Sequence, residues 1–176
     1  MRSHHTSSTP APTPSAPATP VAPGTPLVLT AKVLEDARNF FEDRGTFGLE
    51  GTAMIKKGTG IELVVPRQNA HRDAYGHVNV EVPREGQMDL ADALDPDDLY
   101  VARIHSHPGD AFHSAADDAN PVISFEGGIS IVVPFFGLGL RRGLDACAVY
   151  LFHDGSWVEL KAGPDRNRWI VAGKSS

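Results

Sequence analysis

Two histidines separated by a single residue constrain this chain more than any other feature. They lie in His105-Ser106-His107-Pro108, directly after residues 101–104 (Val-Ala-Arg-Ile), whose composition predicts a β-strand. Because alternate side chains of a strand point to the same face, both imidazoles can approach one ion. Ser114 and Asp117 follow, three residues apart. A catalytic zinc takes three protein ligands and leaves one position for water, so the two histidines and one aspartate would complete a ligand set.

At these residues the chain resembles the JAMM (MPN+) metalloproteases. Their signature is an upstream glutamate, then His-x-His-Pro and, after a short gap, Ser-x-x-Asp. The gap here, residues 109–113, is one residue shorter than the family usually has. Asp117 keeps the Ser-x-x-Asp spacing, whereas Asp118 keeps the usual distance from His107; we prefer Asp117, because the serine and the acid act together. Glu50, which small and apolar residues follow, fits the upstream glutamate.

The resemblance implies a fold and a chemistry. The fold would be α/β, of the JAMM/MPN type (cytidine-deaminase-like), with a mixed sheet flanked by helices in a single domain. His105, His107 and Asp117 would hold one Zn²⁺ per chain, although two nitrogens and one oxygen also suit iron or manganese. Glu50 would accept a proton from the metal-activated water that attacks the carbonyl and pass it to the departing amine. Ser114 would hydrogen-bond the developing oxyanion.

The resemblance also implies a substrate class. JAMM enzymes commonly hydrolyse the amide bond after the terminal glycine of ubiquitin or a ubiquitin-like protein. The compact chain looks like the prokaryotic, deubiquitinase-like members, several of which are encoded beside ubiquitin-like, E1-like and E2-like proteins, some in antiphage operons. The expected function is therefore that of a bacterial, cytoplasmic zinc isopeptidase or peptidase that removes or matures a ubiquitin-like protein. Expected partners are that protein or its conjugates, with E1-like and E2-like proteins of the same operon.

Other interpretations of the same residues stay open. The chain could be a metal-free MPN-type scaffold or interaction module, or a metallopeptidase acting on a small carrier-protein or amino-acid conjugate. Ser114 and Asp117 also have the spacing of a helix capping box, and Glu50 could be a solvated strand acid. A zinc nucleobase deaminase is excluded because it needs a cysteine pair, and Cys147 is the single cysteine.

Composition narrows the class of protein. The chain has 176 residues and a net charge of -6 without a dense run of lysine and arginine, which argues against a nucleic-acid partner. Its apolar runs are too short to span a membrane. A lone cysteine provides no disulfide framework and fits a reducing cytoplasm, and Cys147 is expected to be a small buried hydrophobe in a strand. Residues 1–26, rich in Ser, Thr, Pro and Ala, predict a disordered tail before a JAMM-like domain at residues 27–176.

Periodicity predicts the elements of that domain. Apolar spacing and a candidate N-cap at Thr30 predict a helix over residues 31–42, which Gly45 would end. His113 is expected to be a partly exposed loop residue without a chemical role, with orientation of substrate or of a ligand as the alternative. Residues 135–140 are expected to form a core-facing loop, or a partner surface if they are exposed. The remaining predicted elements are hairpins over residues 50–56 and 61–66 and over 147–152 and 157–160, strands over 78–82 and 129–133, and a helix over 88–94.

Overall fold

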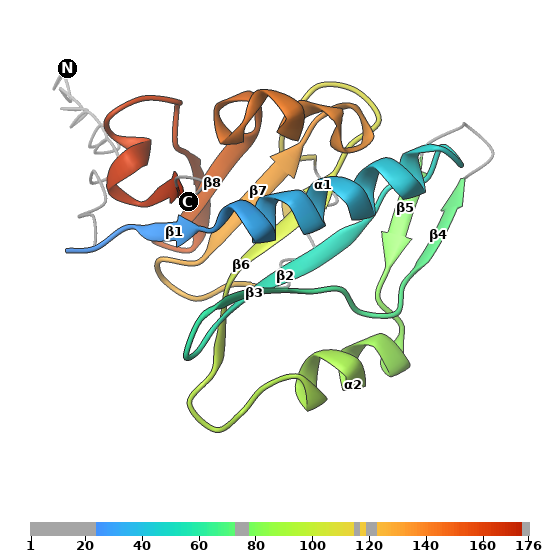
Figure 1. Cartoon of the computed structure of the whole chain (residues 1–176), viewed down its shortest axis with the longest axis horizontal. Helices are drawn as coiled ribbons and strands as arrows, with labels where there is room; N and C mark the ends of the chain where they lie inside the picture. Colours follow the sequence, from blue (N-terminus) through green and yellow to red (C-terminus); the bar gives the residue numbers. More distant parts are fainter. Residues whose placement is uncertain (1–23, 73–77, 115–116, 119–122, 174–176) are drawn as a thin grey trace, which may run out of the picture.

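A six-stranded sheet organises the chain in this computed structural model, which describes residues 24–72, 78–114, 117–118 and 123–173 (Figure 1). The predicted tail lies outside these residues up to position 23. In spatial order the strands are β3 (Ile61–Val64), β2 (Thr52–Lys57), β6 (Leu99–Ser106), β7 (Ile129–Val133), β8 (Ala148–His153) and β9 (Ser156–Glu159). Strands β6 and β7 are parallel and the other neighbours are antiparallel, so the sheet is mixed.

Both predicted hairpins are confirmed, with ends that differ by a residue or two. The turn between β8 and β9 places Asp154 and Gly155 at φ 48° and 74°, the left-handed pair that a two-residue hairpin loop requires. The predicted strand over residues 129–133 coincides with β7, and every residue in it is buried. Cys147 is buried as expected, but it lies one residue before β8 rather than inside the strand.

Helix α1 (Ala31–Gly45) lies across one face of the sheet (Figure 1). The Thr30 hydroxyl accepts a hydrogen bond from the backbone N–H of Val33 at 3.2 Å, which confirms the predicted N-cap. Val33, Ala37 and Phe41 recur every four residues and are buried. They pack into a core with the alternate side chains of the four central strands, including Ala53, Ile55, Ala102, Ile104, Ile129, Ile131, Val133, Val149 and Leu151. The other face of these strands is therefore left for the polar side chains described below.

Smaller elements complete a single mixed α/β domain. A two-stranded sheet joins β1 (Leu27–Leu29) to β10 (Ile170–Ala172), and a hairpin pairs β4 (Asn69–Arg72) with β5 (Val78–Glu81). Strand β4 was not predicted, because its sequence lacks β-branched and aromatic residues. Helix α2 (Arg84–Asp92) begins four residues before the predicted start, directly after Pro83. None of the helices among the described residues has the length and apolar character needed to cross a bilayer.

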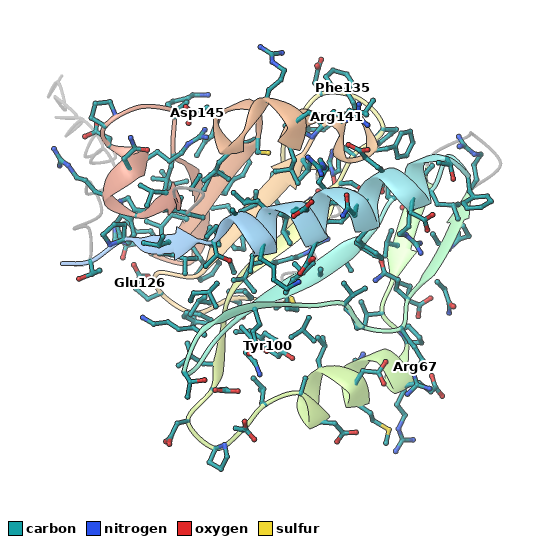
Figure 2. All side chains as sticks on the ribbon, in the orientation of Figure 1. Arg67, Tyr100, Glu126, Phe135, Arg141 and Asp145 are labelled. Carbon is teal, nitrogen blue, oxygen red and sulfur yellow. The ribbon has the colours of Figure 1, made fainter. Side chains whose placement is uncertain are left out.

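Residues 135–140 are not an irregular loop. They belong to η1 (Phe135–Arg142), a 3₁₀ segment with a kink at Phe136 and Gly137, and two shorter 3₁₀ turns follow as η2 (Leu144–Ala146) and η3 (Arg166–Arg168). Leu140 is buried, whereas Phe135 is exposed and lies near Arg141 in Figure 2. The backbone N–H of Phe136 donates to the His107 carbonyl at 2.8 Å. Segment η1 thereby holds the chain immediately after β6.

Candidate metal centre

Strand pairing places the predicted acid beside the predicted ligands. Thr52 of β2 lies opposite His105 of β6. The pairing continues one step further, because Ser106 N–H donates to the Gly51 carbonyl at 3.0 Å and the Ser106 hydroxyl accepts from Gly51 N–H at 3.0 Å. Alternation then puts His105, His107 and the residue before Gly51 on the face away from α1. That residue is Glu50, so it lies just outside β2 rather than within the predicted strand.

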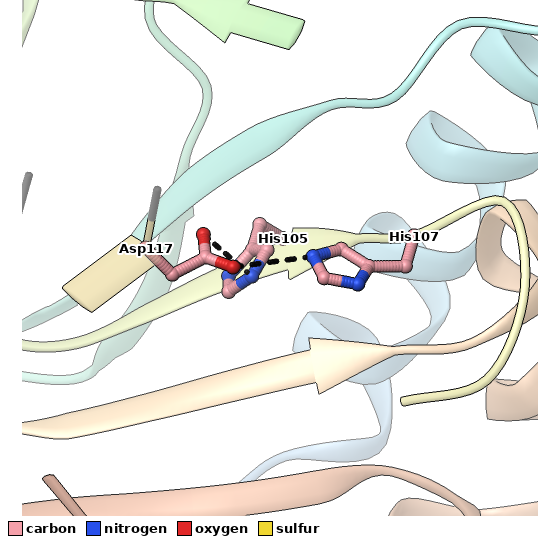
Figure 3. A group of neighbouring side chains, drawn as sticks. All are labelled: His105, His107 and Asp117. Atoms are coloured by element: carbon pink, nitrogen blue, oxygen red, sulfur yellow. Dashed lines mark ion pairs between the residues drawn. The ribbon is translucent and has the colours of Figure 1, made fainter. Parts of the chain in front are cut away.

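His105, His107 and Asp117 converge at this face (Figure 3). The Nε2 atom of His105 lies 3.2 Å from Asp117 Oδ1, and the Nε2 atom of His107 lies 3.3 Å from Asp117 Oδ2. All three side chains are buried. Neither ring nitrogen of His105 has a hydrogen-bond partner among the described residues. Buried polar nitrogens without a hydrogen-bond partner cost free energy, and a bound cation would satisfy Nε2, the nitrogen that faces Asp117, so the residues present fit a divalent metal ion.

The charge states of His105 and Asp117 are those that a metal requires. Burial lowers the pKa of His105 to about 3, and the charge of Arg103 acts in the same direction, so the imidazole is neutral at pH 7. Burial alone would raise the pKa of Asp117. The contacts from His105 and His107 outweigh burial and keep that pKa below its usual range. The neutral imidazole of His105 and the Asp117 carboxylate can therefore bind a cation without first releasing protons.

Glu50 has the protonation behaviour of a general acid/base. Burial raises the pKa of its carboxyl from 4.5 to about 7; the charges of His107 and Arg103 oppose that shift and the charge of Asp117 adds to it. A carboxyl that titrates near neutral pH can both accept and return a proton. The backbone at this position is also held from the other side of the sheet, because Arg44 Nε donates to the Glu50 carbonyl at 2.6 Å.

Ser114 and Asp117 form the capping arrangement that their spacing allows. Ser114 N–H and its hydroxyl donate to Asp117 Oδ2 at 3.0 and 2.7 Å, and Asp117 N–H donates back to the Ser114 hydroxyl at 3.2 Å. Asp117 can therefore take part in the capping box and also present its carboxylate to a metal ion. Ser114 has one hydroxyl hydrogen, and here it points at Asp117, so donation to an oxyanion requires rotation of this side chain.

The neighbouring acid points elsewhere. Asp118 has a side chain that is 57% exposed and contacts His113 at 3.0 Å rather than the two strand histidines. The structure therefore brings Asp117, and not Asp118, to the candidate centre.

Sequence reasoning assigned no role to Arg103, which lies two residues before His105 on the same face. Its Nη2 atom is 3.2 Å from Asp117 Oδ1, and its Nε donates to the Thr52 hydroxyl at 3.2 Å. The alternation that relates His105 to His107 extends back to Arg103, and that pattern could have identified it. A second group of one histidine and two acids consists of Glu126, His153 and Asp154. Both acids are exposed, and they contact different ring nitrogens of His153.

His113 lies in a loop, as expected, but its side chain is more enclosed than expected. Its side chain is 5% exposed, and its ring stacks on Tyr150 with centroids 4.1 Å apart. Tyr150 belongs to β8 and lies beside Ser130 of β7, whose hydroxyl is 2.8 Å from His113 Nε2. These partners are far away in the sequence, so no local sequence pattern predicts the contacts.

A cavity of about 610 Å³ opens beside the loop that links His107 to Ser114. Asp110 and Ala111 of that loop form part of its wall. The remaining lining comes from η1, η2, the start of β8 and the segment after β9: Pro134, Phe135, Leu138, Gly139, Arg142, Asp145, Ala146, Cys147, Ala148, Glu159, Lys161, Ala162 and Arg166. None of the three converging side chains lines it, so the cavity adjoins the candidate centre without containing it.

Comparisons with known proteins agree with a metal centre on this fold. No family model matches the chain. Over 82 residues it is 37% identical to a protein of Sinorhizobium fredii (strain NBRC 101917 / NGR234) described as "Probable metalloprotease y4jG". The match covers 47% of this chain and only 41% of that relative. The fold is similar to the solution structure of protein DSY2949 from Desulfitobacterium hafniense, with a TM-score of 0.53 and 16% identity over 85% of this chain and 94% of that one.

Proposed function

We propose that this protein is a zinc-dependent peptidase of the JAMM type that removes or matures a ubiquitin-like protein by hydrolysing the amide bond after its C-terminal tail. The observation that carries the proposal is the convergence of His105, His107 and Asp117, with the buried nitrogens of His105 left without a hydrogen-bond partner among the described residues. The metalloprotease name of the partial relative supports the class of reaction. The order Glu50, His-x-His-Pro, Ser-x-x-Asp supports the family.

The side chains divide the work of amide hydrolysis. A divalent cation held by the three ligands would polarise the scissile carbonyl and acidify a water molecule. Glu50 accepts the proton of the attacking water, because its raised pKa makes the carboxylate a base near neutral pH. It then returns that proton to the departing amine. Ser114, after turning from Asp117, donates a hydrogen bond to the oxyanion, and no covalent acyl-enzyme forms.

The proposed substrate class follows from the resemblance and fits the surroundings of the centre. The cavity of about 610 Å³, whose wall includes Asp110 and Ala111 of the loop between His107 and Ser114, offers a place for part of an extended tail. Phe135 and Leu138 at its wall are each nearly half exposed, and they offer apolar contacts to such a tail. We extend the proposal to E1-like and E2-like proteins as partners in the same bacterial cytoplasm.

Metal content and cleavage together test the proposal. The purified chain should contain one zinc per molecule by elemental analysis. It should release a reporter from a panel of ubiquitin-like proteins, each fused to the reporter through its terminal glycine. Glu50→Gln should lose turnover and keep the metal, whereas His107→Ala should lose both. Glu62→Gln is the matched control, because Glu62 is an exposed strand acid on β3.

The outcomes separate the alternatives. A protein that binds no divalent metal would instead be a scaffold of the same fold. The protein could instead bind metal and release amino acids from small carrier-protein conjugates without releasing the reporters. The substrate would then be such a conjugate and not a ubiquitin-like protein.

A further inference from the structure

We propose that His113 is a positioning residue: it ties the segment that supplies Asp117 to strands β7 and β8 and so sets where that carboxylate stands relative to His105 and His107. The inference rests on the proposed metal centre and adds to it the device that holds the third ligand in place. The chain needs such a device because its three ligands are not equally supported.

The two histidines are held by the sheet. His105 is a residue of β6, with β2 on one side and β7 on the other. His107 follows the strand, and its backbone N–H donates to the Val133 carbonyl at 2.9 Å while its carbonyl accepts from Phe136 N–H at 2.8 Å. Both imidazoles therefore project from backbone that is fixed on each side.

Asp117 has no comparable backbone support within the described residues. Its N–H donates to the Ser114 hydroxyl, and the next N–H, of Asp118, donates to the Ser114 carbonyl at 3.1 Å. Both bonds stay inside the segment that begins at Ser114. They define the local shape of the segment but do not attach it to the sheet.

His113 makes that attachment. Its backbone N–H donates to the hydroxyl of Tyr150 at 3.1 Å, and its ring lies flat on the Tyr150 ring, with an interplanar angle of 20°. The ring of Trp157 also contacts the His113 ring, at an interplanar angle of 73° and with ring centroids 5.0 Å apart. Strands β8 and β9 thus clamp the residue that precedes Ser114.

Each ring nitrogen of His113 contacts a polar side chain. Nε2 lies 2.8 Å from the hydroxyl of Ser130 in β7, and Nδ1 lies 3.0 Å from Oδ1 of Asp118. A carboxylate can only accept, so Asp118 places the imidazole proton on Nδ1, and Nε2 then accepts from the Ser130 hydroxyl. His113 before Ser114 and Asp118 after Asp117 therefore bracket the capping box and fasten it to β7.

The chain Asp118–His113–Ser130 has the bond order of a hydrolytic triad, but the geometry does not permit that role. Ser130 lies in the second position of β7 and is 1% exposed. A substrate carbonyl cannot reach its hydroxyl, and that hydroxyl already bonds to His113. The group is therefore suited to hold a structure and not to attack a substrate.

Metal affinity measured apart from activity tests the inference. Metal-free protein is titrated with Co²⁺, and the dissociation constant and the visible spectrum of the bound ion are recorded for each variant. His113→Phe keeps an aromatic ring against Tyr150 and removes both nitrogen contacts. Ser130→Ala removes only the Nε2 contact and tests the same attachment in a protein that retains the histidine. Residues that hold metal ligands in place typically control affinity by about 10- to 100-fold, so both variants should bind Co²⁺ that much more weakly, with an altered spectrum.

A merely structural role would lower the melting temperature of the metal-free form without moving these readouts. His71→Phe is the control, because His71 is an exposed histidine in β4 far along the chain from the centre, and it should bind Co²⁺ like the unmodified protein. Unchanged Co²⁺ affinity in both His113→Phe and Ser130→Ala would overturn the positioning role and leave the proposed function standing. Absence of Co²⁺ binding in the unmodified protein would overturn the metal centre and the inference together.

Discussion

The hydroxyl of Ser106 accepts a hydrogen bond from the backbone N–H of Gly51 at 3.0 Å, across 55 positions of sequence. Ser106 separates the two histidines, and its side chain points away from them and is fully buried. Gly51 separates Glu50 from β2. The single bond therefore joins the residue between the ligands to the residue beside the acid, so the distance from Glu50 to the candidate centre is set by backbone pairing.

We expect Ser106→Ala to lower the free energy of unfolding by more than the removal of one hydroxyl group would suggest. It leaves the buried Gly51 N–H without its acceptor, which costs about 1–3 kcal/mol. Urea unfolding of the metal-free variant measures this loss of stability. Turnover should fall further than metal affinity does, because the change loosens Glu50 and leaves both imidazoles on β6. Equal losses in turnover and metal affinity would contradict this assignment.

Replacing Glu50 with Gln should stabilise the metal-free protein at high pH. The folded pKa of about 7 lies above the ordinary value of 4.5, so the folded state binds the proton more tightly. Its stability then falls as the pH rises from the lower value to the higher one, and Gln does not titrate. Because Glu50 is partly exposed to solvent, the advantage of Gln at pH 8 should be about 1–3 kcal/mol.

Urea unfolding in the presence of a chelator, at pH 4.5 and pH 8, measures this difference. The advantage of Glu50→Gln should vanish at the lower pH, where both side chains are uncharged in most molecules. A difference that is the same at both values would show that the carboxyl is not held near neutrality.

The two consecutive aspartates should respond differently to the same substitution. Asp117→Asn removes the carboxylate that contacts both histidines, so it should abolish stoichiometric metal binding. Asp118→Asn keeps that carboxylate and alters only the partner of His113 Nδ1, so metal should bind with a reduced affinity. Elemental analysis after gel filtration distinguishes the two. If Asp118→Asn lost the metal while Asp117→Asn kept it, the ligand would be Asp118 instead of Asp117.

Cys147 should be inert in the folded protein. Burial raises the pKa of its thiol to about 12, so almost no thiolate exists at neutral pH. Disulfide-exchange reagents should react with the native chain far more slowly than with the chain in urea. Rapid labelling of the native protein would show that the cavity wall at this residue opens to reagent.

Local rules were sufficient for much of the fold. Strand alternation predicted that His105 and His107 share a face. The hydroxyl of Thr30 predicted a helix cap, and the backbone freedom of Asp154-Gly155 predicted a hairpin turn. Each depends on residues within a few positions of one another, where sequence spacing translates directly into geometry. The same reasoning missed β4 and η1, which are held by pairing and packing partners elsewhere in the chain.

By itself, then, the sequence determined which residue types could meet at a metal centre and the face on which two of them lie. The tertiary structure decided which aspartate completes the group and that the side chain of His113 is enclosed. It also decided that Arg103 reaches Asp117. The physical reason is that a side chain's surroundings are set by strands that pair across long stretches of chain. Ser130 and Tyr150 become neighbours only when β7 and β8 hydrogen-bond, and only then does His113 have a place to dock.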